Sequence, residues 1–267
     1  RLLRGKKPPI ILILGLRQVG KSTLAMSLGD KKGYVRFNFD LIGDRQEFVN
    51  QDRHTLALFA KKYQGKLVIV DEIQKLPEAT AVVKHLYDTY GMTFVLTGSS
   101  EIKIRSGIGD SLVGRVHELK LYPLSLREIN IQSGLGFDPK SEYNNFEDNQ
   151  KNILNYLVYG SMPNLQNIPV SQYQTYLFDF VNTIIAKDVL EVGGMIKTTQ
   201  VYQLSKLLAL QIGQLVNFNE LASNTELSRQ SVYRYIDMLE QMGLIIRAKP
   251  ISTNERESIA KATKIYF

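Results

Sequence analysis

The stretch that decides the fold is ILILGLRQVGKSTLAM, residues 11–26. Its apolar, β-branched start predicts a buried strand, and residues 15–22 then match the pattern G-x4-G-K-[ST], which we call the phosphate loop. Glycines allow such a loop to wrap backbone N–H groups around phosphates, and the helix that follows turns its positive end toward the anion. The expected nucleotide-binding residues are Gly15, Arg17, Gln18, Val19, Gly20, Lys21, Ser22 and Thr23.

Two residues of the phosphate loop have specific expected roles. Lys21 supplies a positive charge to the β- and γ-phosphates of a nucleotide, which also makes it a catalytic candidate. Ser22 supplies a hydroxyl ligand to Mg²⁺. The loop alone predicts that a nucleotide is bound and does not yet say whether the nucleotide is hydrolysed.

A second motif, LVIVDE at residues 67–72, adds the residues that hydrolysis needs. Asp71 ends an apolar strand, and from there it can reach the Mg²⁺ held by Ser22, directly or through water. Glu72 is the residue type that polarises an attacking water. The alternative is a strand that ends in two solvated acids.

Two further segments are catalytic candidates. Thr97 and Ser99, in the strand end TGSS, could orient the water beside the γ-phosphate, or they could close an ordinary polar turn. Arg115, just before the next expected strand, could stabilise charge on the transferring phosphoryl group in its own site or in a neighbouring chain's. The alternative for Arg115 is a surface arginine.

Strand and helix patterns alternate through the first part of the chain. Strands are expected within residues 8–16, 34–40, 66–72, 92–100 and 116–125, with a single helix over residues 44–65. This alternation predicts an α/β fold with a largely parallel sheet that is covered on both faces. The expected domains are an ATPase core at 1–125, a helical lid at 126–198, a winged helix-turn-helix at 199–251 and the start of a truncated domain at 252–267.

The winged helix-turn-helix is expected because three helical segments precede the apolar segment LIIRAKPI. Its recognition helix, opened by Ser228, would bury Val232, Ile236 and Leu239. The expected DNA contacts are Arg229, Gln230, Tyr233 and Arg234, with Arg247 and Lys249 adding phosphate contacts from the wing. The alternative is a packing module between the ATPase and a partner, because Glu226, Asp237 and Glu240 dilute the positive field.

Composition limits the remaining classes. The 267 residues are 44% hydrophobic with a net charge of +7, so the chain is globular and only moderately basic. It contains no cysteine, which excludes disulfide and Cys-based metal sites, and we expect a cytoplasmic protein without a membrane span. Because residue 1 is Arg, we expect the sequence to be part of a longer product.

Together these motifs resemble a family of AAA+-like P-loop ATPases from bacteria and archaea. The resemblance rests on GLRQVGKST at residues 15–23, DEIQ at 71–74, TGSS at 97–100, and Gly114-Arg115 followed by PLS and Glu128. It implies an ASCE-type core with sheet order 5-1-4-3-2, a helical lid and a winged helix. By resemblance, Thr97 or Ser99 stands at sensor 1 and Arg115 at the arginine finger. The family often continues into a nuclease-like DUF4143 domain, of which KATKIYF at residues 261–267 would be the first strand.

Two functions follow from these expectations. The first is a Mg²⁺-dependent ATPase with ATP and Mg²⁺ as ligands, acting alone or as a homo-oligomer. The alternative is a DNA- or protein-binding switch that nucleotide controls, with hydrolysis slow or negligible.

Overall fold

The computed structural model describes residues 8–29, 33–49, 52–99, 112–132, 146–185, 198–248, 250 and 263–267. Ser100 and Lys249, two residues that the sequence motifs include, lie outside the described residues. The chain divides into two compact units, Arg1–Leu177 and Phe178–Phe267. This division is coarser than the four predicted domains, which stay a prediction.

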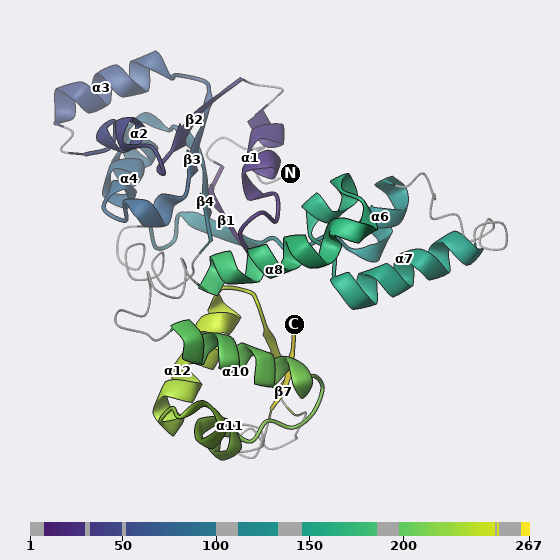
Figure 1. Ribbon diagram of the computed structural model, residues 1–267. Coiled ribbons are helices and arrows are strands. Elements are labelled where there is room, and N and C mark those ends of the chain that lie inside the picture. The colour runs from purple at the N-terminus through teal and green to yellow at the C-terminus, as the bar shows by residue number, and fades with distance from the viewer. Residues whose placement is uncertain are drawn as a thin grey trace. The chain divides into compact units, whose positions relative to one another are not determined.

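The first unit is built on a five-stranded sheet (Figure 1). Its strands are β1 (Ile10–Leu14), β2 (Tyr34–Asn38), β3 (Leu67–Asp71), β4 (Thr93–Gly98) and β5 (Val116–Lys120). The order in the sheet is β2-β3-β4-β1-β5, and every neighbouring pair is parallel. This is the predicted order 5-1-4-3-2, so the predicted α/β P-loop fold is confirmed. All carboxyl ends of the strands lie along one edge of the sheet.

Side-chain alternation along β1 explains why both faces of the sheet are covered. Ile10, Leu12 and Leu14 point into a core shared with α3 (Arg53–Lys62) and α4 (Ala79–Tyr90). Ile11 and Ile13 point into a smaller core shared with α1 (Lys21–Gly29). Figure 1 shows the resulting layers, with α1 on one side of the sheet and α2 (Ile42–Gln46), α3 and α4 on the other. A fully buried β1 fixes the point at which the phosphate loop leaves the sheet.

The predicted helix over residues 44–65 is wrong in one respect, because the structure has two helices there. These are α2 (Ile42–Gln46) and α3 (Arg53–Lys62). Asp52 begins the second one, and its side chain accepts a hydrogen bond from Thr55 N at 2.7 Å. An aspartate in this N-cap position satisfies an otherwise unpaired backbone amide, so it starts a new helix instead of continuing an old one.

The described residues between 126 and 183 are mostly helical, as expected. They form α6 (Leu126–Gln132), α7 (Phe146–Tyr159), two short 3-10 helices, η2 (Pro163–Asn167) and η3 (Val170–Gln172), and α8 (Tyr173–Thr183). Helix α7 ends at Tyr159, and Gly160, which follows it, has a left-handed φ of 72°. Among the described helices, none is long and apolar enough to cross a membrane.

The second unit contains α10 (Thr198–Leu210), α11 (Phe218–Thr225) and α12 (Arg229–Gln241), followed by β6 (Ile246–Ala248) and β7 (Lys264–Tyr266). Ser228 caps α12 by accepting a hydrogen bond from Ser231 N at 3.1 Å. Val232, Ile236 and Leu239 are buried, as the helical spacing predicted.

Residues 263–267, the described end of the segment that we expected to open a further domain, contribute β7 to the second unit, and the further domain itself stays a prediction. β7 pairs antiparallel with β6, with Ile246 opposite Tyr266. Gly213 N also donates to Ile265 O at 3.1 Å, and Ile265 is buried. A short strand needs a partner for its backbone groups, and β6 provides one within the same unit.

Candidate functional site

The phosphate loop begins at a glycine that the fold requires. A Cβ atom built on Gly15 would lie 2.3 Å from the carbonyl oxygen of Leu121. Leu121 follows β5, and its N–H donates to Leu14 O at 2.7 Å, so neither backbone segment can move away freely. Gly15 is therefore fixed by the contact between the ends of β1 and β5, and this contact sets the direction in which the loop leaves the sheet.

Two residues within the loop have left-handed backbone conformations, Gln18 with φ 60° and Gly20 with φ 98°. A left-handed residue turns successive N–H groups toward a common point, which is how such loops form anion sites. Lys21 starts α1, is only 4% exposed, and donates to Gly15 O at 3.1 Å and Leu16 O at 2.7 Å. The ammonium group thus folds back over the loop and lies where a bound phosphate would meet it.

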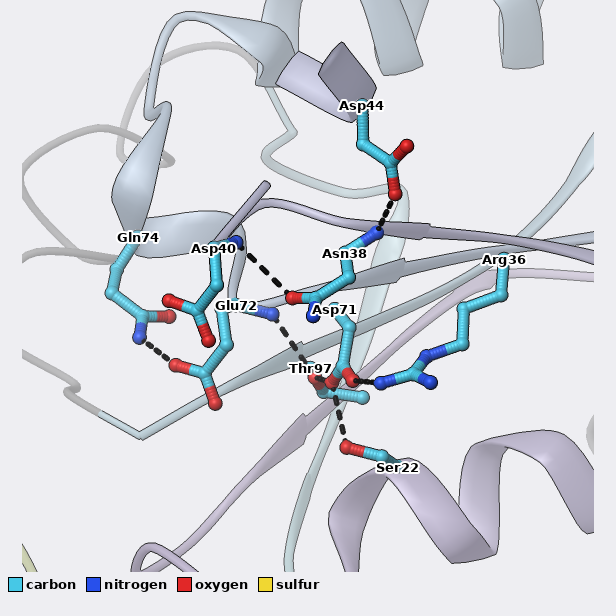
Figure 2. A network of polar contacts seen from close by, with 9 residues as sticks. All are labelled: Ser22, Arg36, Asn38, Asp40, Asp44, Asp71, Glu72, Gln74 and Thr97. Carbon is cyan, nitrogen blue, oxygen red and sulfur yellow. Dashed lines mark hydrogen bonds and ion pairs between the residues drawn. The ribbon is translucent and has the colours of Figure 1, made fainter. Parts of the chain in front are cut away.

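Asp71 lies beside the loop and is held by groups from three other elements (Figure 2). Ser22 Oγ, on α1, donates to Asp71 Oδ1 at 2.9 Å, and Thr97 Oγ1, on β4, donates to the same oxygen. Arg36, on β2, forms an ion pair with Asp71 Oδ2 at 2.6 Å. Burial alone would raise the pKa of Asp71, but these hydrogen bonds and the charge of Arg36 outweigh it and lower the pKa. Asp71 is therefore a carboxylate at neutral pH.

Ser22 and Asp71 together offer two oxygen atoms that fit Mg²⁺. Ser22 Oγ and Asp71 Oδ1 are adjacent hard oxygen donors, the ligand type that Mg²⁺ prefers. Such sites take only one or two protein ligands and complete the shell with phosphate oxygens and water. Among the described residues there is no group of three or more His, Cys, Asp and Glu side chains that could hold a metal.

Glu72 directly follows Asp71 in the chain and has a strained backbone conformation. Its φ of 59° and ψ of 46° are left-handed, which for a residue with a Cβ costs free energy and is typical of functional positions. Thr97 Oγ1 accepts the Glu72 N–H at 3.3 Å, so one hydroxyl orders both acids. Gln74 Nε2 donates to Glu72 Oε2, and Ser99 Oγ lies 3.4 Å from the same oxygen. The carboxylate is thus held in place at the edge of the sheet.

Sheet order explains why these side chains meet. β4 lies between β1, which leads into the phosphate loop, and β3, which carries Asp71. Thr97 is fully buried at the carboxyl end of β4, with Ile13 of β1 as its register partner. The structure thus brings together five of the predicted site residues, namely Ser22, Asp71, Glu72, Thr97 and Ser99.

Comparison with known families agrees with this geometry. Residues 7–130 match the AAA domain, and residues 150–267 match a domain of unknown function, DUF8612. Residues 7–130 are an AAA+-like P-loop ATPase domain. Its assignment rests on the matched domain together with the phosphate loop, the Asp71–Glu72 pair and the strand order described above.

Curated relatives of the chain are longer than it is. An uncharacterized protein of Methanocaldococcus jannaschii is 26% identical over 100% of this chain, and one of Haemophilus influenzae is 26% identical over 90% of it. This chain covers 62% of each of these two proteins. A Mycobacterium tuberculosis protein is 22% identical over 98% of the chain, which covers 54% of that protein. The chain therefore spans less than two thirds of the length of these relatives.

Solved structures show weaker similarity. The Aeropyrum pernix ORC1 protein in complex with DNA has a TM-score of 0.37 and 14% identity, over 99% of this chain and 84% of its own. The Thermotoga maritima RuvB Holliday junction branch migration motor has a TM-score of 0.43 and 16% identity, over 97% of this chain and 89% of its own. Neither similarity is high enough to bear on what the AAA+-like domain of this chain acts upon.

Arg115 does not join the site of its own chain. Val116 is the register partner of Ile10, so Arg115 lies level with the start of β1, whereas the phosphate loop follows its end. Four strand residues at about 3.3 Å each separate the two levels by about 13 Å. Arg115 instead forms a forked ion pair with Asp88 of α4, at 2.9 and 3.0 Å. The own-site role is therefore wrong for the AAA+-like domain, and action in a neighbouring chain stays a prediction.

Sequence reasoning missed two residues of the site, Arg36 and Gln74. An arginine inside β2, in a sheet expected to be covered on both faces, was a usable signal because a charge there needs a partner. Gln74 appeared only as a motif letter, yet it is 5% exposed and its Nε2 also donates to Ser99 Oγ at 3.0 Å. A contact of this kind, between a loop and the next strand end, has no local signal in the sequence.

The four predicted DNA-contact residues of α12 share one exposed face, and they are Arg229, Gln230, Tyr233 and Arg234. Tyr233 stacks on Phe218 of α11 with ring centroids 4.0 Å apart. Arg247, also expected to contact phosphate, instead forms ion pairs with Asp237 and Glu240. These pairs compensate two of the three acids that we expected to dilute the positive field.

Proposed function

We propose that this chain binds ATP with Mg²⁺ at the phosphate loop and hydrolyses it. The observation that carries the proposal is the cluster of Ser22, Asp71 and Glu72, which one hydroxyl, that of Thr97, helps to order. A site that only bound nucleotide would need the loop and one acid. The second acid, held by its own set of donors, supplies a group for activating water.

Each side chain then has a separate task. The loop amides and Lys21 bind the phosphates, and Ser22 and Asp71 would hold Mg²⁺, which when bound neutralises developing charge on the phosphates. Glu72 accepts a proton from the attacking water, and because Gln74 and Ser99 occupy Oε2, we assign Oε1 to that proton. Thr97 and Ser99 orient the carboxylate, so their part in catalysis is indirect.

A Glu72→Gln variant tests this assignment. The amide keeps the shape of the side chain and cannot accept the proton, so we expect turnover to fall by about 100-fold or more while ATP affinity stays near the wild-type value. Release of phosphate and affinity for a fluorescent ATP analogue are the two measurements. Glu78→Gln, the same change at an exposed position before α4, is the matched control. Equal turnover in the Glu72→Gln variant and the wild type would reject the hydrolytic role.

The exposed face of α12 favours a second candidate, in which the second unit is a winged helix that binds DNA under control of the nucleotide. Arginine, glutamine and tyrosine are residue types that contact phosphates and base edges. DNA affinity of the wild type and of a variant carrying Arg229→Ala and Arg234→Ala, each with and without ATP, should be measured over a series of salt concentrations. If this face contacts phosphates, the slope of log affinity against log salt concentration should be negative. In the double variant the magnitude of that slope should fall by about 2. Absence of binding at low salt would leave a protein as the partner.

A further inference from the structure

Gln18 makes a contact that phosphate binding does not require. Its Oε1 accepts a hydrogen bond from Tyr176 OH at 2.7 Å and a longer one from Asn164 Nδ2 at 3.4 Å. Tyr176 lies on α8 and Asn164 on η2, which are remote in sequence from the phosphate loop but belong to the same unit. The loop is thus tied by one side chain to the helical segment of the first unit.

The contact can stabilise the strained backbone conformation of Gln18. Glycine adopts a φ of 60° at little cost, whereas a residue with a Cβ adopts it only when its surroundings compensate. The same left-handed turn directs the loop amides toward an anion. Without the two donors to its side chain, Gln18 would lose part of the interaction that holds its backbone in this conformation.

The Tyr176 hydroxyl is a suitable hydrogen-bond donor for this contact. Burial raises the pKa of Tyr176 above its ordinary value, so its hydroxyl is protonated at neutral pH. The tyrosine has a hydroxyl to donate and Gln18 has an amide oxygen to accept, so the pair is correctly matched. An ordered donor on a helix is suited to fix a loop.

We propose that Gln18 is a positioning residue, through which Tyr176 and Asn164 hold the phosphate loop in its nucleotide-binding shape. Linkage makes the effect reciprocal: if the contact strengthens nucleotide binding, bound nucleotide must strengthen the contact by the same factor, and the donor Tyr176 belongs to α8. Helix α8 includes Leu177 and Phe178, at which the two units divide. The inference rests on the proposed function only in that ATP is the ligand of the loop.

Affinity for a fluorescent ATP analogue with Mg²⁺ tests the proposal in three variants of the full chain. Tyr176→Phe removes only the hydroxyl, Gln18→Ala removes the acceptor, and the double variant removes both. We expect each single variant to bind about five-fold more weakly, and the double variant to bind no more weakly than the worse single one. Additive losses, or wild-type affinity in Tyr176→Phe, would overturn the proposal. Tyr173→Phe, the same change earlier on α8, is the matched control.

Gln18→Gly separates the side-chain contact from backbone strain. Glycine relieves the strain of the left-handed turn, so if that conformation were the whole role of Gln18, the variant would bind at least as well as wild type. The proposal instead predicts a loss similar to that of Gln18→Ala. Because Gln18 is exposed, these variants are expected to fold, and their thermal unfolding midpoints check this directly.

Hydrogen exchange of the α8 amides gives a readout that a merely structural role would not produce. The ATP analogue should slow exchange in α8 of the wild type and leave it unchanged in Tyr176→Phe at saturating nucleotide. Equal slowing in both proteins would reject the coupling. If the wild type itself does not bind the analogue, the proposed function fails and this inference fails with it. Wild-type binding that Lys21→Ala abolishes and Tyr176→Phe leaves unchanged rejects this inference alone.

Discussion

The carboxyl edge of the sheet and the exposed face of α12 are the two regions that the sequence marked for function, and they are built in opposite ways. At the sheet edge, Asp71 is buried and each of its oxygens has a partner from another element. On α12, the four marked side chains are exposed while the opposite face packs into the core. A residue of the first region serves stability and chemistry together, whereas a residue of the second can serve binding alone.

The largest expected effect on stability is that of Gly15→Ala. The new methyl would lie 2.3 Å from a backbone oxygen, so no side-chain rotation can relieve the overlap, and the ends of β1 and β5 must move apart. We expect the free energy of unfolding to fall by about 3 kcal/mol, together with loss of nucleotide binding. Urea denaturation of the full chain measures the first effect.

Gly43→Ala is the matched control for this substitution. Gly43 lies in α2, and its added Cβ would meet no atom within 4 Å. Alanine favours a helix over glycine, so this variant should keep or slightly exceed wild-type stability. A Gly15→Ala protein as stable as Gly43→Ala would show that the sheet edge is less tightly packed than the contact with Leu121 implies.

Arg36→Gln is expected to have a smaller and pH-dependent effect. Because the folded pKa of Asp71 lies below its unfolded value, the ionised carboxylate stabilises the fold above the unfolded pKa, and this contribution is lost as pH falls through the folded pKa. Removing the guanidinium moves the pKa of Asp71 back toward its ordinary value. At neutral pH we expect a loss of about 1 kcal/mol, modest because Arg36 is partly exposed.

The sign of this prediction is checked by acid titration. The difference in unfolding free energy between wild type and Arg36→Gln should shrink as the pH falls toward about 3. Arg53→Gln, which removes an exposed arginine in the first turn of α3, controls for the change in net charge. A difference that stayed constant over the whole pH range would show that Arg36 acts through packing and not through the charge of Asp71.

The sequence predicted well those features of the fold and of the site that a local pattern of residues encodes. The apolar runs predicted all five strands of the sheet, and two short motifs predicted that Ser22 and Asp71 would meet. Arg115 shows a mistake that sequence order could have prevented, since a residue before a parallel strand lies at the edge opposite to the loops that follow the strands. Asp52 likewise carried the signal for a new helix.

Other features depend on packing between distant segments and leave no local trace. Arg36 reaches Asp71 only because β2 and β3 are neighbours, and Tyr176 reaches Gln18 only because the helical segment lies against the loop. The pairing of β7 with β6 is of the same kind, because a strand of three residues does not specify its partner. Such contacts require the fold first, and the site is then completed by them.

The smallest expected effect belongs to α12 and completes the comparison. Gln230→Ala truncates an exposed side chain on a helix, so the free energy of unfolding should change by less than about 0.5 kcal/mol. Ile236→Ala, on the buried face of the same helix, should cost about 3 kcal/mol because it leaves a cavity. Urea denaturation of both variants measures the contrast. If Gln230→Ala lowered the free energy of unfolding, this face of α12 would have to pack against another part of the protein. If the variant is as stable as wild type, any loss of DNA or partner binding can be attributed to the loss of the contact made by Gln230.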